Sequence, residues 1–291
     1  MTISLRHAIW AAILLAASSI NAQVSPIIDL GYAQYQGTVN TSTNLTTFLG
    51  IRYAAAPIDN LRFRAPHPPQ NVTGVQQATA EPNECFQATD GASPTNPLES
   101  RDIVVATSED CLFLSVYYPS DAEGVPEGPL PTLVWIHGGG YVSGAASMYR
   151  GTDLINQSNR GIVVVTIQYR LGLFGFLPGA EVKKNGALNS GLLDQDFALR
   201  WVNEHISKFG GDPSKVTIWG ESAGAGSVLQ HLVANNGQTE PQLFRGAITS
   251  STFLPSQYNY NDPIPESLYS EVVAQTNCTG ATDVRSIGEY G

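Results

Sequence analysis

One serine of this chain lies between small residues in a pattern typical of a strained strand-to-helix turn. The segment Gly220-Glu221-Ser222-Ala223-Gly224 matches G-x-S-x-G, with a β-branched run at residues 216–219 before it and a helix-like stretch at 226–233 after it. Glycines two positions before and two after the serine let such a turn form without clashes. The pattern predicts that Ser222 is a nucleophile for acyl transfer.

A second glycine-rich segment could stabilise the negative charge that develops during acyl transfer. His137-Gly138-Gly139-Gly140 follows a short apolar run at residues 133–136, and a tri-glycine loop can turn successive N–H groups toward an oxyanion. We assign this role to the backbone amides of Gly139, Gly140 and Ala223, and we expect His137 to brace the loop through its ring nitrogens. A phosphate-binding loop is disfavoured, because the chain has no G-x-x-x-x-G-K and no G-x-G-x-x-G that opens a helix.

The elements that would carry these groups alternate between strands and helices. Apolar residues at i, i+4 spacing from Leu193 to Phe209 predict a helix, which Gly210-Gly211-Asp212-Pro213 would end. Such alternation predicts an α/β fold with a mostly parallel sheet flanked by helices. Residues 23–100 are expected to form short strands, turns and loops. Strand-like patterns occupy residues 112–118, 133–136, 162–167, 216–219 and 247–249.

Composition narrows the class of protein and of partner. The 291 residues are 42% hydrophobic and 14% charged, which is too apolar for a disordered chain and favours a soluble globular domain. A net charge of −10 disfavours nucleic acid as a partner, since phosphates would be repelled. The motifs at Ser222 and at residues 137–140, and not the composition, lead us to expect a small-molecule or lipid ester as substrate. We assign no metal ligand and no cofactor.

The first residues predict export. Arg6 and His7 precede an apolar run at residues 8–17, and small residues stand before Gln23, so residues 1–22 are interpreted as a signal peptide. An apolar run of about ten residues is too short for a transmembrane anchor, which needs about 20. We therefore expect a secreted glycoprotein. Five N-glycosylation sequons agree with this expectation, at Asn40, Asn44, Asn71, Asn156 and Asn277.

The three cysteines leave one without a partner. In an exported chain, a bridge between Cys85 and Cys111 would close a loop of moderate size and add roughly 3 kcal/mol of stability. Cys278 would then be unpaired, which suggests that the chain stops before its partner appears.

Longer segments resemble a known family. Residues 209–224 resemble the active-serine signature of the type-B carboxylesterases, a family that includes cholinesterases and fungal secreted lipases, and residues 109–119 resemble its second signature. The similarity runs from about the mature N-terminus to Asp283. It implies that residues 23–291 are the N-terminal part of an α/β-hydrolase domain that cleaves carboxylic esters through an acyl-serine intermediate.

The resemblance also assigns supporting residues. It implies a Cys85–Cys111 disulfide and places Glu221 beside the site without making it a member of the catalytic triad. It further implies two salt bridges, which join Arg62 to Glu109 and Arg170 to Asp194.

No histidine is placed to act as the general base. The triad order in this fold is Ser, then Asp or Glu, then His, and only His231 follows Ser222. Nine helical residues span about 13 Å, whereas a base must lie within about 3 Å of the hydroxyl. Family members are much longer and supply the acid and the base from the part that is absent here. We therefore expect a chain that is truncated at its C-terminal side and inactive as a fragment.

A different class of function stays open at this stage. Some cholinesterase-like proteins are non-catalytic binding or adhesion proteins, but those typically lose the serine, and Ser222 is present. Lipases, esterases and amidases share this machinery, so the sequence predicts the reaction class and leaves the acyl and alcohol preference open.

Overall fold

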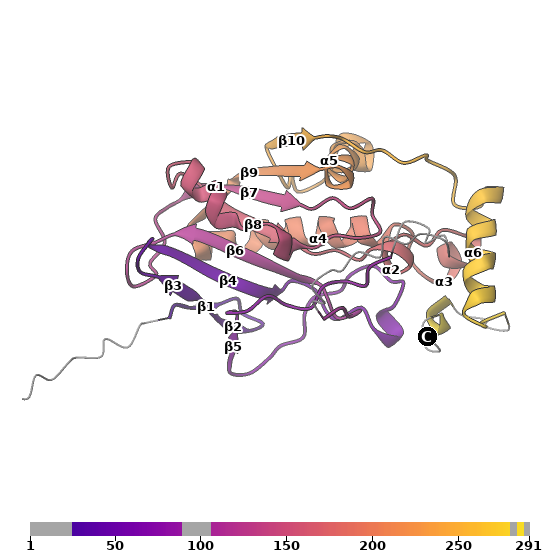
Figure 1. Ribbon diagram of the computed structural model, residues 1–291, viewed down its shortest axis with the longest axis horizontal. Coiled ribbons are helices and arrows are strands. Elements are labelled where there is room, and N and C mark those ends of the chain that lie inside the picture. The colour runs from indigo at the N-terminus through magenta and orange to yellow at the C-terminus, as the bar shows by residue number, and fades with distance from the viewer. Residues whose placement is uncertain (1–24, 89–105, 280–283, 288–291) are drawn as a thin grey trace, which may run out of the picture.

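A seven-stranded sheet forms the centre of the molecule (Figure 1). The computed structural model describes residues 25–88, 106–279 and 284–287, so the predicted signal peptide at 1–22 lies outside the described residues. The strand order is β10-β9-β7-β8-β6-β4-β3. The strands are β3 (Thr38–Asn40), β4 (Leu45–Arg52), β6 (Phe113–Pro119), β7 (Leu130–Ile136), β8 (Val163–Ile167), β9 (Gly211–Glu221) and β10 (Gly246–Ser250).

The sheet is parallel on one side and antiparallel on the other. The pairs β10–β9, β9–β7 and β7–β8 are parallel, whereas the pairs β8–β6, β6–β4 and β4–β3 are antiparallel. The parallel part is the one in which helices connect successive strands, as crossover connections require. The predicted strands are therefore present in a mixed sheet. Residues 23–100, which were expected to form short strands, turns and loops, add β3 and the eight-residue strand β4 to its antiparallel part.

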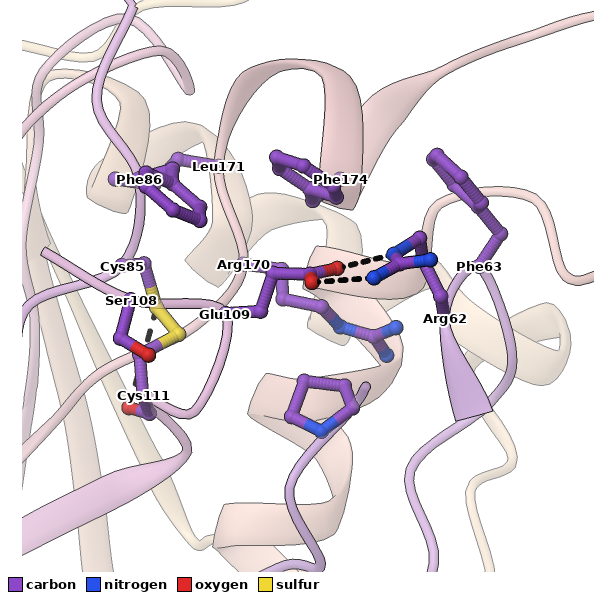
Figure 2. Close-up of a pocket in the computed structure, with 11 residues that line it drawn as sticks. Arg62, Phe63, Cys85, Phe86, Ser108, Glu109, Cys111, Arg170, Leu171 and Phe174 are labelled. Carbon is purple, nitrogen blue, oxygen red and sulfur yellow. Dashed lines mark hydrogen bonds and ion pairs between the residues drawn. A yellow bond between two sulfur atoms is a disulfide. The ribbon is translucent and has the colours of Figure 1, made fainter. Parts of the chain in front are cut away.

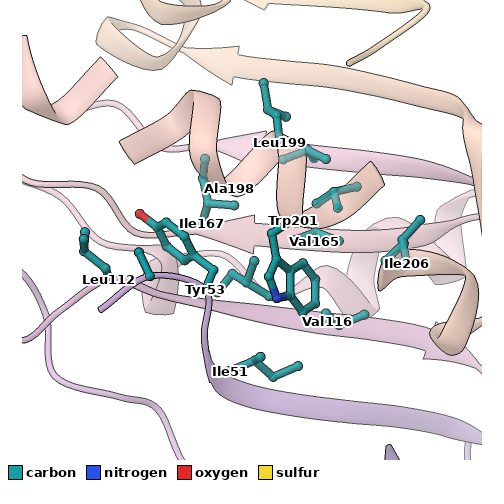
Figure 3. Packing of buried hydrophobic residues seen from close by; sticks show 14 of the residues in the cluster. Ile51, Tyr53, Leu112, Val116, Val165, Ile167, Ala198, Leu199, Trp201 and Ile206 are labelled. Carbon is teal, nitrogen blue, oxygen red and sulfur yellow. The ribbon is translucent and has the colours of Figure 1, made fainter. Parts of the chain in front are cut away.

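Helices cover both faces of this sheet. The neighbouring residues Val164 and Val165 of β8 point to opposite faces. Val164 packs with Ile155 of α1 (Gly151–Gln157), and Val165 lies in the main core with Leu199 of α4 (Ser190–His205). Figure 3 shows that core, in which Trp201 and Ile206 also face the sheet. The α5 helix (Ala223–Val233) lies on the same face as α4, because Val228 belongs to the same core.

Smaller elements surround the central layers. The predicted helix end is present, because a 3-10 helix (Ile206–Phe209) follows α4 and Gly210 then adopts a φ of 77°. A second sheet contains β1 (Ile27–Asp29), β2 (Gln34–Gln36) and β5 (Val75–Gln77). The other helices are α2 (Gly172–Phe176), α3 (Ala180–Asn185) and α6 (Pro263–Gln275), with further 3-10 turns at Asp59–Leu61, Ala146–Met148, Ala234–Gly237 and Val284–Ser286.

One edge of the sheet is open. The outermost strand, β10, pairs with β9 on one side, and no other described strand pairs with it. Its central residues are exposed, and the side chain of Ile248 is 44% accessible. None of the described helices is long and apolar enough to cross a membrane.

A buried ion pair joins the end of β8 to α4. Both side chains are almost fully buried, and the Arg170 guanidinium donates to both carboxylate oxygens of Asp194 at 2.7 Å. The Arg170 amide also donates to Asp194. Two charges at this depth are tolerated only because each neutralises the other. The pair therefore fixes the start of the segment that follows β8 against the first turns of α4.

A second ion pair and a disulfide hold the N-terminal segment. Arg62 donates to the two carboxylate oxygens of Glu109 at 2.5 and 2.7 Å. Cys85 is bonded to Cys111, and both residues are buried. Figure 2 shows that these two links lie on either side of a small pocket lined by Phe86 and other residues. All the pairs that the resemblance implied are thus present in the structure.

The buried pair predicts an unequal effect of two similar substitutions on α4. Asp194→Ala leaves the Arg170 guanidinium buried without a counter-charge and should lower the free energy of unfolding by about 3–5 kcal/mol. Asp196 pairs with Arg200 of the same helix at 2.7 Å, but both side chains are partly exposed, so Asp196→Ala should cost about 0–1 kcal/mol. Urea denaturation measures both values. If the two variants lost the same free energy of unfolding, the buried pair of Asp194 would contribute no more to stability than the exposed pair of Asp196.

Candidate active site

Ser222 occupies the turn between β9 and α5 in a conformation that few residues adopt. Its φ is 55° and its ψ is −119°, and α5 begins at the next residue, Ala223. Backbone hydrogen bonds hold the turn, because the Ser222 amide donates to Ser250 at 2.9 Å and the Ser222 carbonyl accepts from Phe253 at 3.1 Å and from Gly226 at 3.0 Å. The segment at and after β10 thus anchors the serine, and no described residue hydrogen-bonds to its hydroxyl.

Both glycines of the motif are required by close packing. A β-carbon on Gly220 would lie 2.2 Å from the carbonyl of Gly224. One on Gly224 would lie 2.0 Å from the carbonyl oxygen of Ile136, which ends β7. A side chain at either position would therefore clash with a specific neighbour, which is Gly224 across the turn for Gly220 and Ile136 on the adjacent strand for Gly224.

Strand register brings the tri-glycine loop beside the serine. Ile136 of β7 pairs with Gly220 of β9, so the residues that leave the two strands emerge next to each other. A β-carbon on Gly138 would lie 2.7 Å from the Glu221 carbonyl and 3.0 Å from the Ser222 β-carbon. The loop therefore rests directly on the turn that carries Ser222.

The loop has the conformation that exposes backbone amides. Gly139 and Gly140 have φ values of 105° and 63°, which a residue with a side chain rarely adopts. The Gly139 carbonyl accepts from the amides of Val142 and Ser143, whereas the amides of Gly139 and Gly140 donate to no acceptor in the described part of the chain. Ala223 opens α5, so its amide has no acceptor within the helix.

His137 is buried under the loop. Its Nδ1 lies 2.8 Å from the Gly138 carbonyl oxygen, its ring stacks on Tyr169 at 4.4 Å, and the Tyr169 hydroxyl donates to the His137 carbonyl at 2.7 Å. Burial lowers the pKa of His137 to about 4, partly offset by the Gly138 contact. The ring is neutral at pH 7 and is in contact with the loop through one nitrogen, while Nε2 has no partner among the described residues.

Glu221 lies beside the loop, and the pocket in Figure 2 lies elsewhere. The carboxylate of Glu221 is 2.9 Å from where a β-carbon on Gly138 would be, and the side chain is half-buried. The residues lining the pocket in Figure 2 include Phe63 and Phe174 but neither Ser222 nor any residue of the tri-glycine loop. Among the described residues, no cluster of histidine, cysteine and acidic side chains could hold a metal ion.

His231 is committed to the core. Its Nε2 lies 3.0 Å from Oε1 of Gln195 on α4, and burial lowers its pKa to about 4. Its place on α5 agrees with the prediction that it does not serve Ser222, but it is a buried link between α5 and α4 and so more than an ordinary helix residue.

Some supporting residues had no sequence signal. Gln87 follows the disulfide-bonded Cys85; its side-chain oxygen accepts from the Gly144 amide at 2.6 Å, and its side-chain nitrogen donates to the Gly144 carbonyl at 3.1 Å. Ser250 acts through its carbonyl. Contacts to the backbone leave no characteristic residue pattern, so no motif pointed to either. Tyr169 could have been suspected, because it lies two residues after the end of the buried strand β8.

Comparison with known proteins identifies a family for nearly the whole chain. A family model described as the carboxylesterase family matches residues 24–289. The chain is 40% identical to pyrethroid hydrolase Ces2e of Rattus norvegicus over 283 residues, covering 94% of this chain and 48% of that protein. It is 39% identical to secreted lipase 1 of Botryotinia fuckeliana, covering 81% of this chain and 44% of that protein. The chain thus spans about half the length of the curated relatives it matches.

A solved structure gives the same result. The crystal structure of Aspergillus niger EstA aligns with a TM-score of 0.80 at 41% identity and covers 91% of this chain and 49% of that chain. A solved structure of PNB esterase aligns with a TM-score of 0.72 at 36% identity. The predicted α/β-hydrolase fold is therefore confirmed.

The lowered pKa of His231 predicts a loss of stability in acid. The unfolded chain binds a proton near pH 6.5 and the folded chain only near pH 4, so stability contributed by this group is complete above pH 6.5 and declines as the pH falls toward 4. Between pH 7.5 and 5.5 the titration of His231 should lower the free energy of unfolding by roughly 1 kcal/mol.

The variant His231→Gln isolates this effect. Glutamine can still donate to Gln195 but does not titrate, so the free energy of unfolding of the variant should fall by roughly 1 kcal/mol less than that of the wild type between these two pH values. Guanidinium denaturation at both pH values measures the difference. Identical pH dependence in the two proteins would show that His231 does not titrate with a lowered pKa.

Proposed function

This chain belongs to the carboxylesterase family, and we propose that it hydrolyses carboxylic esters through an acyl-serine intermediate on Ser222. The observation that carries the proposal is the placement of Ser222 on a strained turn against the tri-glycine loop. The Ser222 hydroxyl has no hydrogen-bond partner in the part of the chain that the structure describes, so it is free to meet a substrate carbonyl.

The oxyanion of the intermediate would be held by three backbone amides. The amides of Gly139 and Gly140 donate to no acceptor in the described part of the chain. Ala223 is the first residue of α5, and the positive end of the helix dipole at this point favours a negative charge. Loss of one such donor typically slows acyl transfer by about 10²–10³-fold. In this proposal His137 supports the loop and Glu221 lies beside the site, and neither attacks nor carries the proton.

The proton of Ser222 would need a base from outside the 291-residue sequence. The Nε2 of His231 is hydrogen-bonded to Gln195 in the core, and the ring of His137 is stacked on Tyr169, so we assign the role of base to neither histidine. The acid and the histidine of the triad follow the serine in this fold. We therefore propose that these 291 residues contain the nucleophile and the oxyanion site, and that activity requires the remaining half of the domain.

We further propose that the protein is exported and glycosylated, and that small-molecule or lipid esters are its substrates. All sequon asparagines lie on the surface, at Asn40, Asn44, Asn71, Asn156 and Asn277. Two relatives carry the name of secreted lipases, from Botryotinia fuckeliana and Gibberella zeae. Mass spectrometry of the protein from a eukaryotic secretion host would detect glycans at these positions.

The nucleophile is tested by covalent labelling. We expect an organophosphonate probe to label Ser222 in a form that also carries an acid and a base, such as a fusion to the C-terminal half of Aspergillus niger EstA. Peptide mass spectrometry locates the label, and Ser222→Ala is the control that should carry none. Absence of labelling in the folded fusion, or equal labelling of the alanine variant, would refute the proposal.

The missing base is tested with the 291-residue chain alone. Loss of the catalytic histidine in a serine hydrolase lowers kcat by about 10⁶-fold, so hydrolysis of an activated ester such as p-nitrophenyl acetate should equal that of the Ser222→Ala variant. Rapid turnover that disappears in Ser222→Ala would show that a residue within these 291 serves as the base. Zero turnover in the fusion as well would instead favour a non-catalytic binding protein.

A further inference from the structure

Tyr141 directly follows the tri-glycine loop and has an unfavourable backbone conformation. Its φ is 66°, so Gly139, Gly140 and Tyr141 are three successive residues in the left-handed region. The two glycines adopt this region at little cost, whereas a residue with a β-carbon pays about 1–2 kcal/mol. Something in the surroundings must therefore hold Tyr141 in place.

Contacts from two helices hold Tyr141. Its carbonyl accepts from the amide of Gly172, the first residue of α2, at 2.8 Å. Its ring packs against Phe176 at the end of α2, with ring centres 5.0 Å apart. Its hydroxyl accepts a hydrogen bond from the fully buried Ser227 of α5 at 3.5 Å. The residue thus links the loop to α2 through its backbone and ring and to α5 through its hydroxyl.

The surface of α5 is shaped to receive this hydroxyl. A β-carbon on Gly226 would lie 2.8 Å from the Tyr141 hydroxyl oxygen and 2.2 Å from the Phe253 carbonyl oxygen. Gly226 therefore leaves the space that the hydroxyl occupies. Burial raises the pKa of Tyr141 above its usual value, with the Ser227 contact acting in the opposite direction, so the hydroxyl stays protonated and neutral at physiological pH.

The contact joins the two elements that supply the proposed oxyanion donors. Gly139 and Gly140 lie on the loop, and Ala223 lies at the start of α5, one turn before Ser227. Donors on separate elements stabilise an oxyanion only when their relative position is fixed before the reaction. Tyr141 is the side chain that reaches from the loop to α5.

We propose that Tyr141 is a positioning residue, whose hydroxyl holds the tri-glycine loop against α5 and so fixes the amides of Gly139 and Gly140 relative to that of Ala223. The effect of Tyr141 on catalysis rests on the proposed function. The mechanical part, the contact of the Tyr141 hydroxyl with α5, is independent of any activity and can be measured on the chain as it is.

Hydrogen–deuterium exchange of the 291-residue chain tests the link. Tyr141→Phe removes only the hydroxyl. Within residues 137–144, exchange of the hydrogen-bonded amides of Val142, Ser143 and Gly144 should become up to about fivefold faster, the effect of losing one ordinary hydrogen bond. Ser227→Ala should have a similar effect, and the double variant should add little to either. The matched control is Tyr258→Phe, because Tyr258 is 51% exposed and its hydroxyl forms no hydrogen bond with the described residues.

The outcomes separate a local role from a general one. Unchanged exchange at 137–144 in Tyr141→Phe would overturn the proposal. Faster exchange throughout the chain together with a lower melting temperature would also overturn it, because the hydroxyl would then support the whole fold. Faster exchange confined to residues 137–144, with the melting temperature of the Tyr258→Phe control, supports it.

A kinetic measurement connects the link to chemistry. In the fusion used for labelling, Tyr141→Phe should lower the maximal rate of Ser222 phosphonylation about threefold to tenfold and leave the half-saturating probe concentration unchanged. A changed half-saturating concentration with an unchanged maximal rate would contradict a positioning role. If the wild-type fusion is not labelled at all, the acyl-serine proposal fails, and the exchange experiment still decides whether Tyr141 holds the loop.

Discussion

The close approach of two backbones at the end of β7 and β9 is the constraint on which the candidate site depends. Gly224 lies so near the carbonyl of Ile136 that only a hydrogen atom fits between them. This contact lets α5 begin at once after β9, which forces Ser222 into its strained conformation. The same contact places the loop that leaves β7 against the serine. One steric requirement therefore sets the nucleophile and its oxyanion site together.

The rest of the structure keeps this approach in place from both sides. The Arg170–Asp194 pair ties the segment after β8 to α4, and that segment carries Gly172, which holds Tyr141. On the other side, the Cys85–Cys111 disulfide holds the segment that contains Gln87, and the side chain of Gln87 accepts a hydrogen bond from the Gly144 amide just after the loop. The ion pair and the disulfide thus both support the tri-glycine loop, which has few buried side chains of its own to fix its position.

The sequence predicted those parts of the fold whose signals are local. The continuous β-branched run of β8 and the glycine-proline stop after α4 are patterns that arise from one element alone. The antiparallel part of the sheet was not predicted, because the pairing of β4 with β6 depends on contacts between distant segments. The two glycines of the turn that carries Ser222 were predicted from their spacing, whereas Gln87 and Tyr141 make contacts with residues that only the folded chain brings near them. The assignment of Ser222 as nucleophile stays a prediction.

The open edge of the sheet has a consequence for solubility. The segment Gly-Ala-Ile-Thr-Ser of β10 has neither a charged residue nor a proline, the features with which proteins usually protect an edge strand. Phe253 and Leu254, which follow it, are 42% and 53% exposed. Such an edge is a template on which another strand can add, so self-association of the free chain should rise steeply with concentration.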